Sequence, residues 1–205
     1  MGFIFIKNPS LSESQINFIK TFIFFNTFNK VFQIKFTKKQ SNNIISGIHA
    51  FSSLFLSGSN NIKDLKWFTS AYFVYDLLQI KKLTIMNLAY IYHHLSGLYL
   101  LSHSEEVAVV DMLFWGELSN LSSYPLYYYL HQAVPAPSMI IFFQILQKIL
   151  YTGIRIPILT LKLIQYLKKS PNYKHLFAIV PVYLMGIIWG KTIIKQKLYR
   201  KKNIR

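Results

Sequence analysis

The chain has no cysteine among its 205 residues. Disulfide bonds, thiolate metal sites and a cysteine nucleophile are therefore excluded. Acidic residues are also scarce, with 7 Asp and Glu against 23 Lys and Arg and a formal net charge of +16. Such a charge would suit nucleic acid, but most of the basic residues cluster between apolar stretches and at the C-terminal end, as in membrane proteins. We therefore expect no nucleic-acid partner.

The sequence is also poor in the signals of β-strands and of secretion. Period-2 alternation of apolar and polar residues and glycine-rich turns are missing, which disfavours a β-barrel. Residues 1–10 contain no basic segment ahead of their short apolar run and no small-residue cleavage site. We therefore predict no removed signal peptide.

Apolar sequence is what the chain has in quantity. Hydrophobic residues make up 52% and aromatic residues 17%, and the mean hydropathy of +0.29 is high for a soluble protein. Apolar runs with charged boundaries predict helices at 16–36, 43–57, 67–80, 83–102, 107–124, 138–167 and 175–194. Three prolines predict a break between Tyr124 and Pro137. The predicted fold is all-α, a polytopic transmembrane helical bundle of about six to seven spans around a polar cavity.

The lysines that flank the predicted helices favour one orientation. One side carries the C-terminal tail and six lysines: Lys30, Lys35, Lys38, Lys39, Lys81 and Lys82. The positive-inside rule places this side in the cytoplasm. The other side carries the acidic Glu105-Glu106 loop, although Lys168, Lys169 and Lys174 also fall there.

Two adjacent histidines, His93 and His94, interrupt an apolar helix. Lipid tolerates ionisable groups only with a partner or a wet cavity. Asp76, Glu117 and His49 are also set in apolar sequence, on three other predicted helices. Together the five residues predict a buried polar chamber. Successive helical residues differ by about 100°, so we expect one histidine to face the cavity and the other to reach a neighbouring helix.

Other residues extend this predicted chamber. His49 has Ser46 and Ser53 on its own helix face, either as a packing histidine or as a cavity-lining one. Tyr72 shares the face of Asp76, and Tyr90 shares that of Gly97, where the glycine leaves room for a ligand or another backbone. Arg155 is expected to snorkel to the membrane surface or to meet an acid inside the bundle.

A carboxylate beside an imidazole fixes the tautomer of the ring and raises its basicity. A general base or a nucleophilic histidine requires both properties. The predicted chamber is therefore suited to acyl transfer. A histidine-box metal enzyme is a weaker alternative, because its ligands recur at i, i+3 or i, i+4 spacing, whereas this chain has one adjacent pair and isolated polar groups. We expect no metal.

The order of these residues resembles the TLC domain, a family named for TRAM, Lag and CLN proteins. The resemblance spans roughly residues 38–195. Its elements are a serine-flanked His49, the segment from Tyr72 to Asp76, His93-His94, Glu117-Leu-Ser119, Pro125, Arg155 and a late Trp189. It implies a multi-pass protein of the endoplasmic reticulum membrane concerned with lipid, with residues 1–37 as a first span and boundary and 196–205 as a basic cytoplasmic tail.

Ceramide synthases are the enzymatic branch of this family, and they join a fatty acyl-CoA to a sphingoid base. By this resemblance, His93 and His94 are the catalytic pair and Asp76 orients one of them. A histidine would take the proton from the attacking amine or carry the acyl group as an acyl-imidazole. Acyl-CoA would then be a co-substrate, with no further cofactor.

The stretch after the histidine pair separates this chain from the synthases. Residues 95–110 contain no Asn and no Arg, and Gly97 is their single glycine, whereas Glu117-Leu-Ser119 resembles the non-synthase TLC proteins. We therefore favour a protein that binds, senses or remodels membrane lipids and affects sphingolipid or phospholipid composition. The alternatives are the N-acyltransferase and a helix bundle with a purely structural polar core. Lys201-Lys202 is like a displaced dilysine retrieval signal, or is a positive-inside stop.

Overall fold

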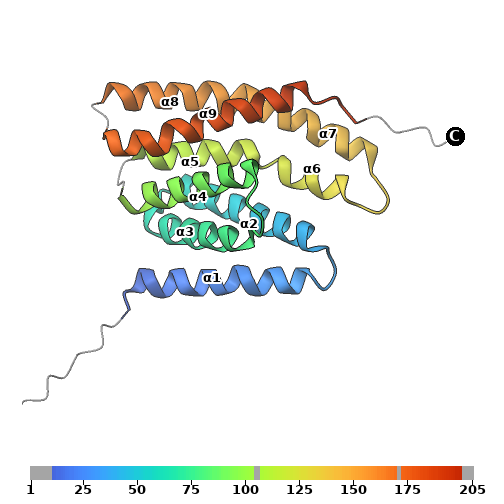
Figure 1. The fold of residues 1–205 in the computed structure, drawn as a ribbon, viewed down its shortest axis with the longest axis horizontal. Helices are drawn as coiled ribbons and strands as arrows, with labels where there is room; N and C mark the ends of the chain where they lie inside the picture. The colour runs from blue at the N-terminus through green and yellow to red at the C-terminus, as the bar shows by residue number, and fades with distance from the viewer. Residues whose placement is uncertain (1–10, 104–106, 170–171, 200–205) are drawn as a thin grey trace, which may run out of the picture.

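The computed structural model describes residues 11–103, 107–169 and 172–199. These residues form helices and no strand, so the all-α class is confirmed. The elements, drawn in Figure 1, are α1 Glu13–Phe32, α2 Lys38–Gly58, α3 Ile62–Gln79, α4 Ile85–His103, α5 Val107–Asn120, α6 Ser123–Leu130, α7 Pro137–Lys148, the π-helix η1 Ile149–Arg155, α8 Ile156–Lys168 and α9 Tyr173–Lys195. Residues 1–10, the Glu105-Glu106 loop and Lys201-Lys202 lie outside the described residues, and the division at 37/38 and 195/196 stays a prediction.

The helices run side by side along the long axis of the molecule (Figure 1). Helix α1 lies at one side and packs against α2 and α3. Helices α8 and α9 lie at the opposite side, and α9 contacts α4. Helix α5 lies between, against α2, η1 and α8. The polar residues of α2 to α5 and η1 are thereby brought toward one interior.

Capping boxes define the first two helix starts. The Ser12 hydroxyl accepts from Gln15 N–H while the Gln15 side chain accepts from Ser12 N–H, and Thr37 and Gln40 repeat the arrangement before α2. Each box satisfies two N–H groups that a helix start leaves without a partner. Helix α1 therefore begins at Glu13, three residues before the predicted start at 16.

The predicted break between Tyr124 and Pro137 is wrong for residues 124–130, which are helical. The interruption comes at residues 121–122, and α6 then occupies Ser123–Leu130. Pro125 lies in the first turn of α6, where a missing N–H removes no helical hydrogen bond. The proline therefore starts a helix here instead of ending one.

Helices α7, η1 and α8 form one helical run over Pro137–Lys168. The π-helical turn Ile149–Arg155 ends two residues before Pro157. In a π-helix the backbone hydrogen bonds join residues five positions apart, one more than in an α-helix. Here this occurs next to a proline, which has no N–H to donate and disturbs the turn before it. The turn also brings Tyr151 and Arg155 to the interior, where both are buried.

Two helices among the described residues are long and apolar enough to cross a membrane. They are Pro137–Lys168, with 32 residues, and Tyr173–Lys195, with 23 residues, whose mean hydropathies over an 18-residue window are 1.4 and 1.8. Helices α1 to α4 have 18 to 21 residues, but they carry more polar side chains. The further spans therefore stay a prediction.

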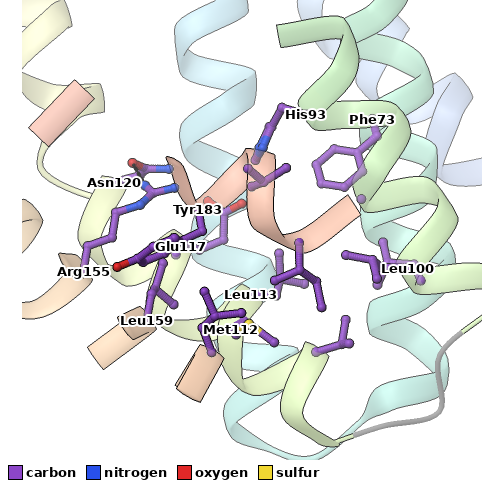
Figure 2. Close-up of a pocket in the computed structure, with 17 residues that line it drawn as sticks. Phe73, His93, Leu100, Met112, Leu113, Glu117, Asn120, Arg155, Leu159 and Tyr183 are labelled. Carbon is purple, nitrogen blue, oxygen red and sulfur yellow. Dashed lines mark hydrogen bonds between the residues drawn. The ribbon is translucent and has the colours of Figure 1, made fainter. Parts of the chain in front are cut away.

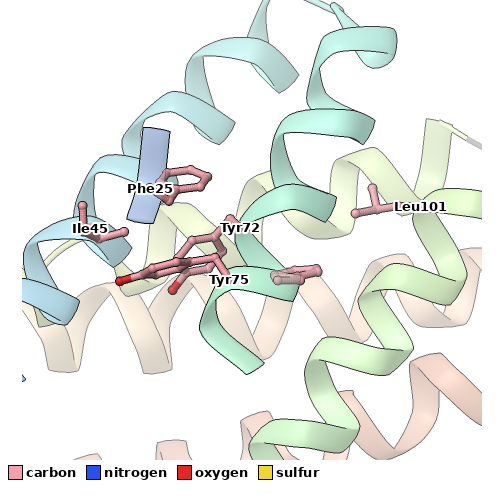
Figure 3. Close-up of a cluster of buried hydrophobic side chains, with 6 residues drawn as sticks. Phe25, Ile45, Tyr72, Tyr75 and Leu101 are labelled. Atoms are coloured by element: carbon pink, nitrogen blue, oxygen red, sulfur yellow. The ribbon is translucent and has the colours of Figure 1, made fainter. Parts of the chain in front are cut away.

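A cluster of buried apolar side chains joins α1 to α4 (Figure 3). Its members are Phe25, Ile45, Tyr72, Phe73, Tyr75 and Leu101. Beside it, the Asn29 amide donates to Oδ1 of Asn42 at 2.6 Å and to the Tyr75 hydroxyl. Because Asn29 is only 3% exposed, these bonds satisfy a polar group inside the bundle and hold α1 to α2 and α3.

Candidate functional site

His94 reaches from α4 to α3. Its Nε2 atom lies 2.7 Å from Oδ2 of Asp76, and the His94 residue is 5% exposed. With the Nε2–H donating to the carboxylate, the ring is held in one orientation and one tautomer. This is the neighbouring-helix contact expected of one member of the pair.

His93 faces the interior instead. It lines a cavity in which the Nδ1 atom of its ring has no hydrogen-bond partner among the described residues. The ring lies edge-on to Phe73 and to Trp189, with centroid distances of 6.3 and 6.5 Å. The geometry thus anchors the His94 ring through Nε2 and leaves Nδ1 of His93, like Nδ1 of His94, without a partner among the described residues.

His49 of α2 lies in a chain of polar contacts. Its Nε2 atom is 3.0 Å from the Ser53 hydroxyl, which is 3.2 Å from the Thr69 hydroxyl. Its ring stacks on Tyr72 at 3.8 Å between centroids, and Nδ1 lies 4.0 Å from Oε1 of Glu117. The Ser46 hydroxyl accepts from the Tyr72 hydroxyl at 2.8 Å, so it orients Tyr72 and not His49.

Arg155 enters the interior from η1. Its Nη1 donates to Oδ1 of Asn120 at 2.7 Å and to the Ser119 hydroxyl at 3.5 Å, and its guanidinium carbon lies 4.7 Å from the Tyr151 ring centroid. Arg155 is 6% exposed, and no ion pair in the part of the chain that the structure describes includes it. The expectation of snorkelling is therefore wrong. An amide and a hydroxyl take the hydrogen-bonding place of the expected acid, and Glu117 lies within electrostatic reach of Arg155 without forming an ion pair.

Ser119 and Tyr90 differ in their relation to the interior. Ser119 was predicted to line the cavity, but it is 0% exposed and is not among the residues that line the two interior cavities, so it acts by accepting a hydrogen bond from Arg155. Tyr90 lines the interior and stacks on Trp189 with 5.3 Å between centroids. Gly97 leaves no room for a ligand on its Cβ side, because the Phe73 ring occupies that space. A side chain from α3 thus occupies the Cβ side of Gly97, while the glycine itself still lines an interior cavity.

Two adjoining cavities occupy this interior. The first, here the apolar cavity, has a volume of about 130 Å³ and is lined largely by aliphatic side chains of α4, α5, α8 and α9. The second, here the polar chamber, has about 570 Å³ and contains His49, Tyr72, Asp76, Tyr90, His93 and His94 in its wall. The two share five lining residues: Phe73, His93, Glu117, Asn120 and Arg155.

Figure 2 shows how polar and apolar groups divide the apolar cavity. Arg155, Asn120 and Glu117 are grouped at one side, and Phe73 and Leu100 lie at the other. These three polar residues, which also line the polar chamber, therefore form a polar end of an otherwise largely apolar cavity, and His93 lies apart from them beside Phe73. Such a division matches a ligand with one apolar and one polar part.

Buried polar atoms without a partner gather at the polar chamber. The described residues contain six such side-chain atoms, and five belong to residues that line the chamber: Nδ1 of His93, Nδ1 of His94, Oε2 of Glu117, Oη of Tyr151 and Nε of Arg155. Each unsatisfied buried polar group costs about 1–3 kcal/mol. Their concentration at one cavity indicates a site for polar ligand groups or water.

Sequence reasoning missed three residues of this site, and helical spacing was the available signal for two of them. Asn120 follows Glu117 at i+3, and Tyr151 precedes Arg155 by four residues, so each pair shares a helix face. Phe73 carried no such signal, because its role depends on α3 packing against Gly97 of α4. No group of three or more His, Asp or Glu that could hold a metal ion occurs among the described residues.

Comparison of the chain with protein-family models, with curated proteins and with solved structures finds no match.

Proposed function

We propose that this chain is a TLC-like, multi-pass membrane protein that binds an amphipathic lipid within its helix bundle and thereby senses or remodels membrane lipid composition. One observation carries the proposal: the apolar cavity and the polar chamber share five lining residues. An acyl chain placed in the apolar cavity therefore has its polar end at His93, Glu117 and Arg155. The resemblance of the residue order to the TLC domain gives further support to this proposal.

A membrane setting is supported by the outer surface of the helices. Large apolar side chains are exposed on α1, α2, α4, α7, α8 and α9, among them Ile23, Phe51, Phe55, Leu95, Phe142, Leu161 and Phe177. Apolar surface this extensive is rare on soluble monomers and suits lipid. Helices α1 to α4, at about 1.5 Å per residue, are about 27–32 Å long, close to the hydrocarbon thickness of about 30 Å. We place the protein in the endoplasmic reticulum membrane with its basic tail in the cytoplasm.

Mass spectrometry of the purified, detergent-solubilised full chain tests lipid binding. We expect a co-purifying amphiphile at near-stoichiometric amount. Gly116→Leu should reduce it at least about tenfold, because a β-carbon at Gly116 meets nothing within 4 Å and the longer side chain enters the apolar cavity. Gly153→Leu is the matched control, since Gly153 is equally uncrowded and lines neither cavity. A lipid-free protein, or equal lipid in both variants, would contradict the proposal and favour a purely structural polar core.

A second candidate function is N-acyl transfer from acyl-CoA to a sphingoid base, favoured by the His94–Asp76 contact beside the available nitrogen of His93. The amine would attack the thioester carbonyl as a histidine takes its proton, and the CoA thiolate would leave. Incubation of purified protein with a long-chain acyl-CoA and a sphingoid base tests this reaction. If the wild-type protein forms product and His94→Ala forms none, the reaction is supported. If the wild-type protein forms no more product than His94→Ala, the reaction is excluded.

A further inference from the structure

The Arg155 guanidinium is a buried cation in the wall of both cavities. Its two hydrogen bonds go to neutral groups, and its Nε atom has no partner among the described residues. A buried charge is costly unless it is paired. A guanidinium offers a planar set of five donors that matches a phosphate or carboxylate. The remaining donors of Arg155 therefore fit an anionic ligand group.

The surroundings of Arg155 favour the same anion. Oδ1 of Asn120 already accepts from Arg155, so the amide nitrogen of Asn120 is left as a donor at the same point. Met86 and Gln196 also line the polar chamber. The exposed Lys195 and Lys197 flank Gln196 in sequence, and the exposed Lys82 lies four residues before Met86. Basic residues near a cavity raise the local concentration of anions.

Glu117 supplies the opposite chemistry in the same space. Its side chain is 12% exposed, its Oε1 lies 4.0 Å from Nδ1 of His49, and its Oε2 has no partner among the described residues. Glu117 and Arg155 line both cavities without forming an ion pair with each other. An acceptor and a cation thus lie at the same side of one cavity, within electrostatic reach of each other but not joined in an ion pair, and Oε2 of Glu117 and Nε of Arg155 are left for different parts of a ligand.

We propose, on the basis of the lipid-binding function above, that the bound lipid has an ambipolar head group: an anionic group held by Arg155 and Asn120, and an ammonium or hydroxyl donor held by Glu117. The acyl chain enters the apolar cavity with its first carbons, because a volume of about 130 Å³ holds only part of a long chain, and the rest of the chain extends beyond the cavity. Phosphate and carboxylate share the chemistry that Arg155 recognises. A head group carrying both a phosphate and an ammonium satisfies both residues at once.

Three single-chain probes with the same oleoyl chain separate these contacts. Lysophosphatidylethanolamine carries phosphate and ammonium, lysophosphatidic acid carries phosphate alone, and monoolein carries neither. Titrated against the detergent-solubilised full chain carrying Trp67→Phe and Trp115→Phe, so that Trp189 in the wall of the polar chamber is the single tryptophan and its fluorescence change is the signal, they should bind in that order of decreasing affinity. Charge-assisted hydrogen bonds predict steps of about tenfold or more.

Matched variants assign each step to a residue. Arg155→Gln should weaken both phosphate probes about tenfold to a hundredfold and leave monoolein unchanged. Asn120→Asp should weaken the same two probes while keeping the fold, because it gives the guanidinium a permanent acidic partner. Glu117→Gln should weaken lysophosphatidylethanolamine about tenfold and leave lysophosphatidic acid unchanged or tighter.

The outcomes distinguish this inference from the function on which it rests. Equal affinity for the three probes would overturn the head-group assignment while leaving lipid binding intact, and oleate as tight as lysophosphatidic acid would identify carboxylate as an equal anion. No binding of any probe would overturn both. If phosphoethanolamine without a chain bound as tightly as the lysolipid, the head-group assignment would hold and the lipid-binding function would fail. If Arg155→Gln does not fold, the order of probe affinities for the wild-type protein and for Asn120→Asp tests the head-group assignment instead.

Discussion

The Phe73 ring lies so close to Gly97 that a β-carbon on this glycine would be 2.3 Å from Cε2 of Phe73 and 3.0 Å from its Cδ2. Helices α3 and α4 approach each other through this contact, next to His93 and His94. Gly97→Ala must displace a ring that is 4% exposed and packed in the α1–α4 cluster. We expect it to lower the free energy of unfolding by about 1–3 kcal/mol, measured by thermal unfolding in detergent.

The control for this substitution is Gly153→Ala, which meets nothing within 4 Å and should be nearly neutral. Gly190→Ala should fall between the two, because its β-carbon would lie 2.7 Å from Cδ1 of Ile156, the far end of a flexible side chain. In the double variant, adding Phe73→Leu to Gly97→Ala should restore part of the stability that Gly97→Ala loses. Equal stability of the Gly97 and Gly153 variants would show that the Phe73 ring moves without cost.

The contact between His94 and Asp76 predicts different effects for two substitutions of the acid. Asp76→Ala leaves Nε2 of His94, whose side chain is 7% exposed, without its acceptor at 2.7 Å. We expect a loss of about 1–3 kcal/mol in the free energy of unfolding. Asp76→Asn retains a carbonyl acceptor and should lose less. The interpretation fails if the two variants unfold at the same temperature as wild type.

The Tyr75 hydroxyl accepts a hydrogen bond from the buried Asn29 amide, and Tyr75 itself is 1% exposed. Tyr75→Phe keeps the ring in its cluster but removes this acceptor, which leaves the amide nitrogen of Asn29 with Oδ1 of Asn42, while Gln33 still donates to the Asn29 carbonyl. We expect a loss of about 1–2 kcal/mol and earlier release of α1, seen as faster hydrogen exchange in α1 than in α9. Tyr173→Phe is the control, because Tyr173 is 78% exposed.

The lack of cysteine allows a direct test of topology, because each single-cysteine variant has one thiol. In sealed microsomes, a membrane-impermeant maleimide should label Lys81→Cys from the cytoplasmic face. Ser59→Cys, at the other end of the α2–α3 pair, should be labelled only after permeabilisation. Phe51→Cys, whose native side chain is 67% exposed on α2, should resist labelling in both conditions if lipid covers it. Rapid labelling of Phe51→Cys in sealed microsomes would contradict the polytopic proposal.

The sequence by itself determined the helical class and the approximate position of most helices, because apolar runs with charged boundaries are local signals. It also determined that His93 and His94 point in different directions, since helical geometry separates adjacent residues by about 100°. The course of the chain around Pro125 was harder to predict. A proline ends a helix in one position and begins one in another, and the choice depends on the packing of α6 against α2 and α7.

Only the tertiary structure decided which residues meet. Asp76 and His94 lie 18 positions apart, and Arg155 and Asn120 lie 35 apart. No local periodicity encodes such contacts, because they depend on how whole helices pack. The same packing put Phe73 against Gly97, left Arg155 without an ion pair among the described residues, and joined the apolar cavity to the polar chamber. The sequence therefore supplied the polar groups, and the arrangement of the helices determined which of them remain available to a ligand.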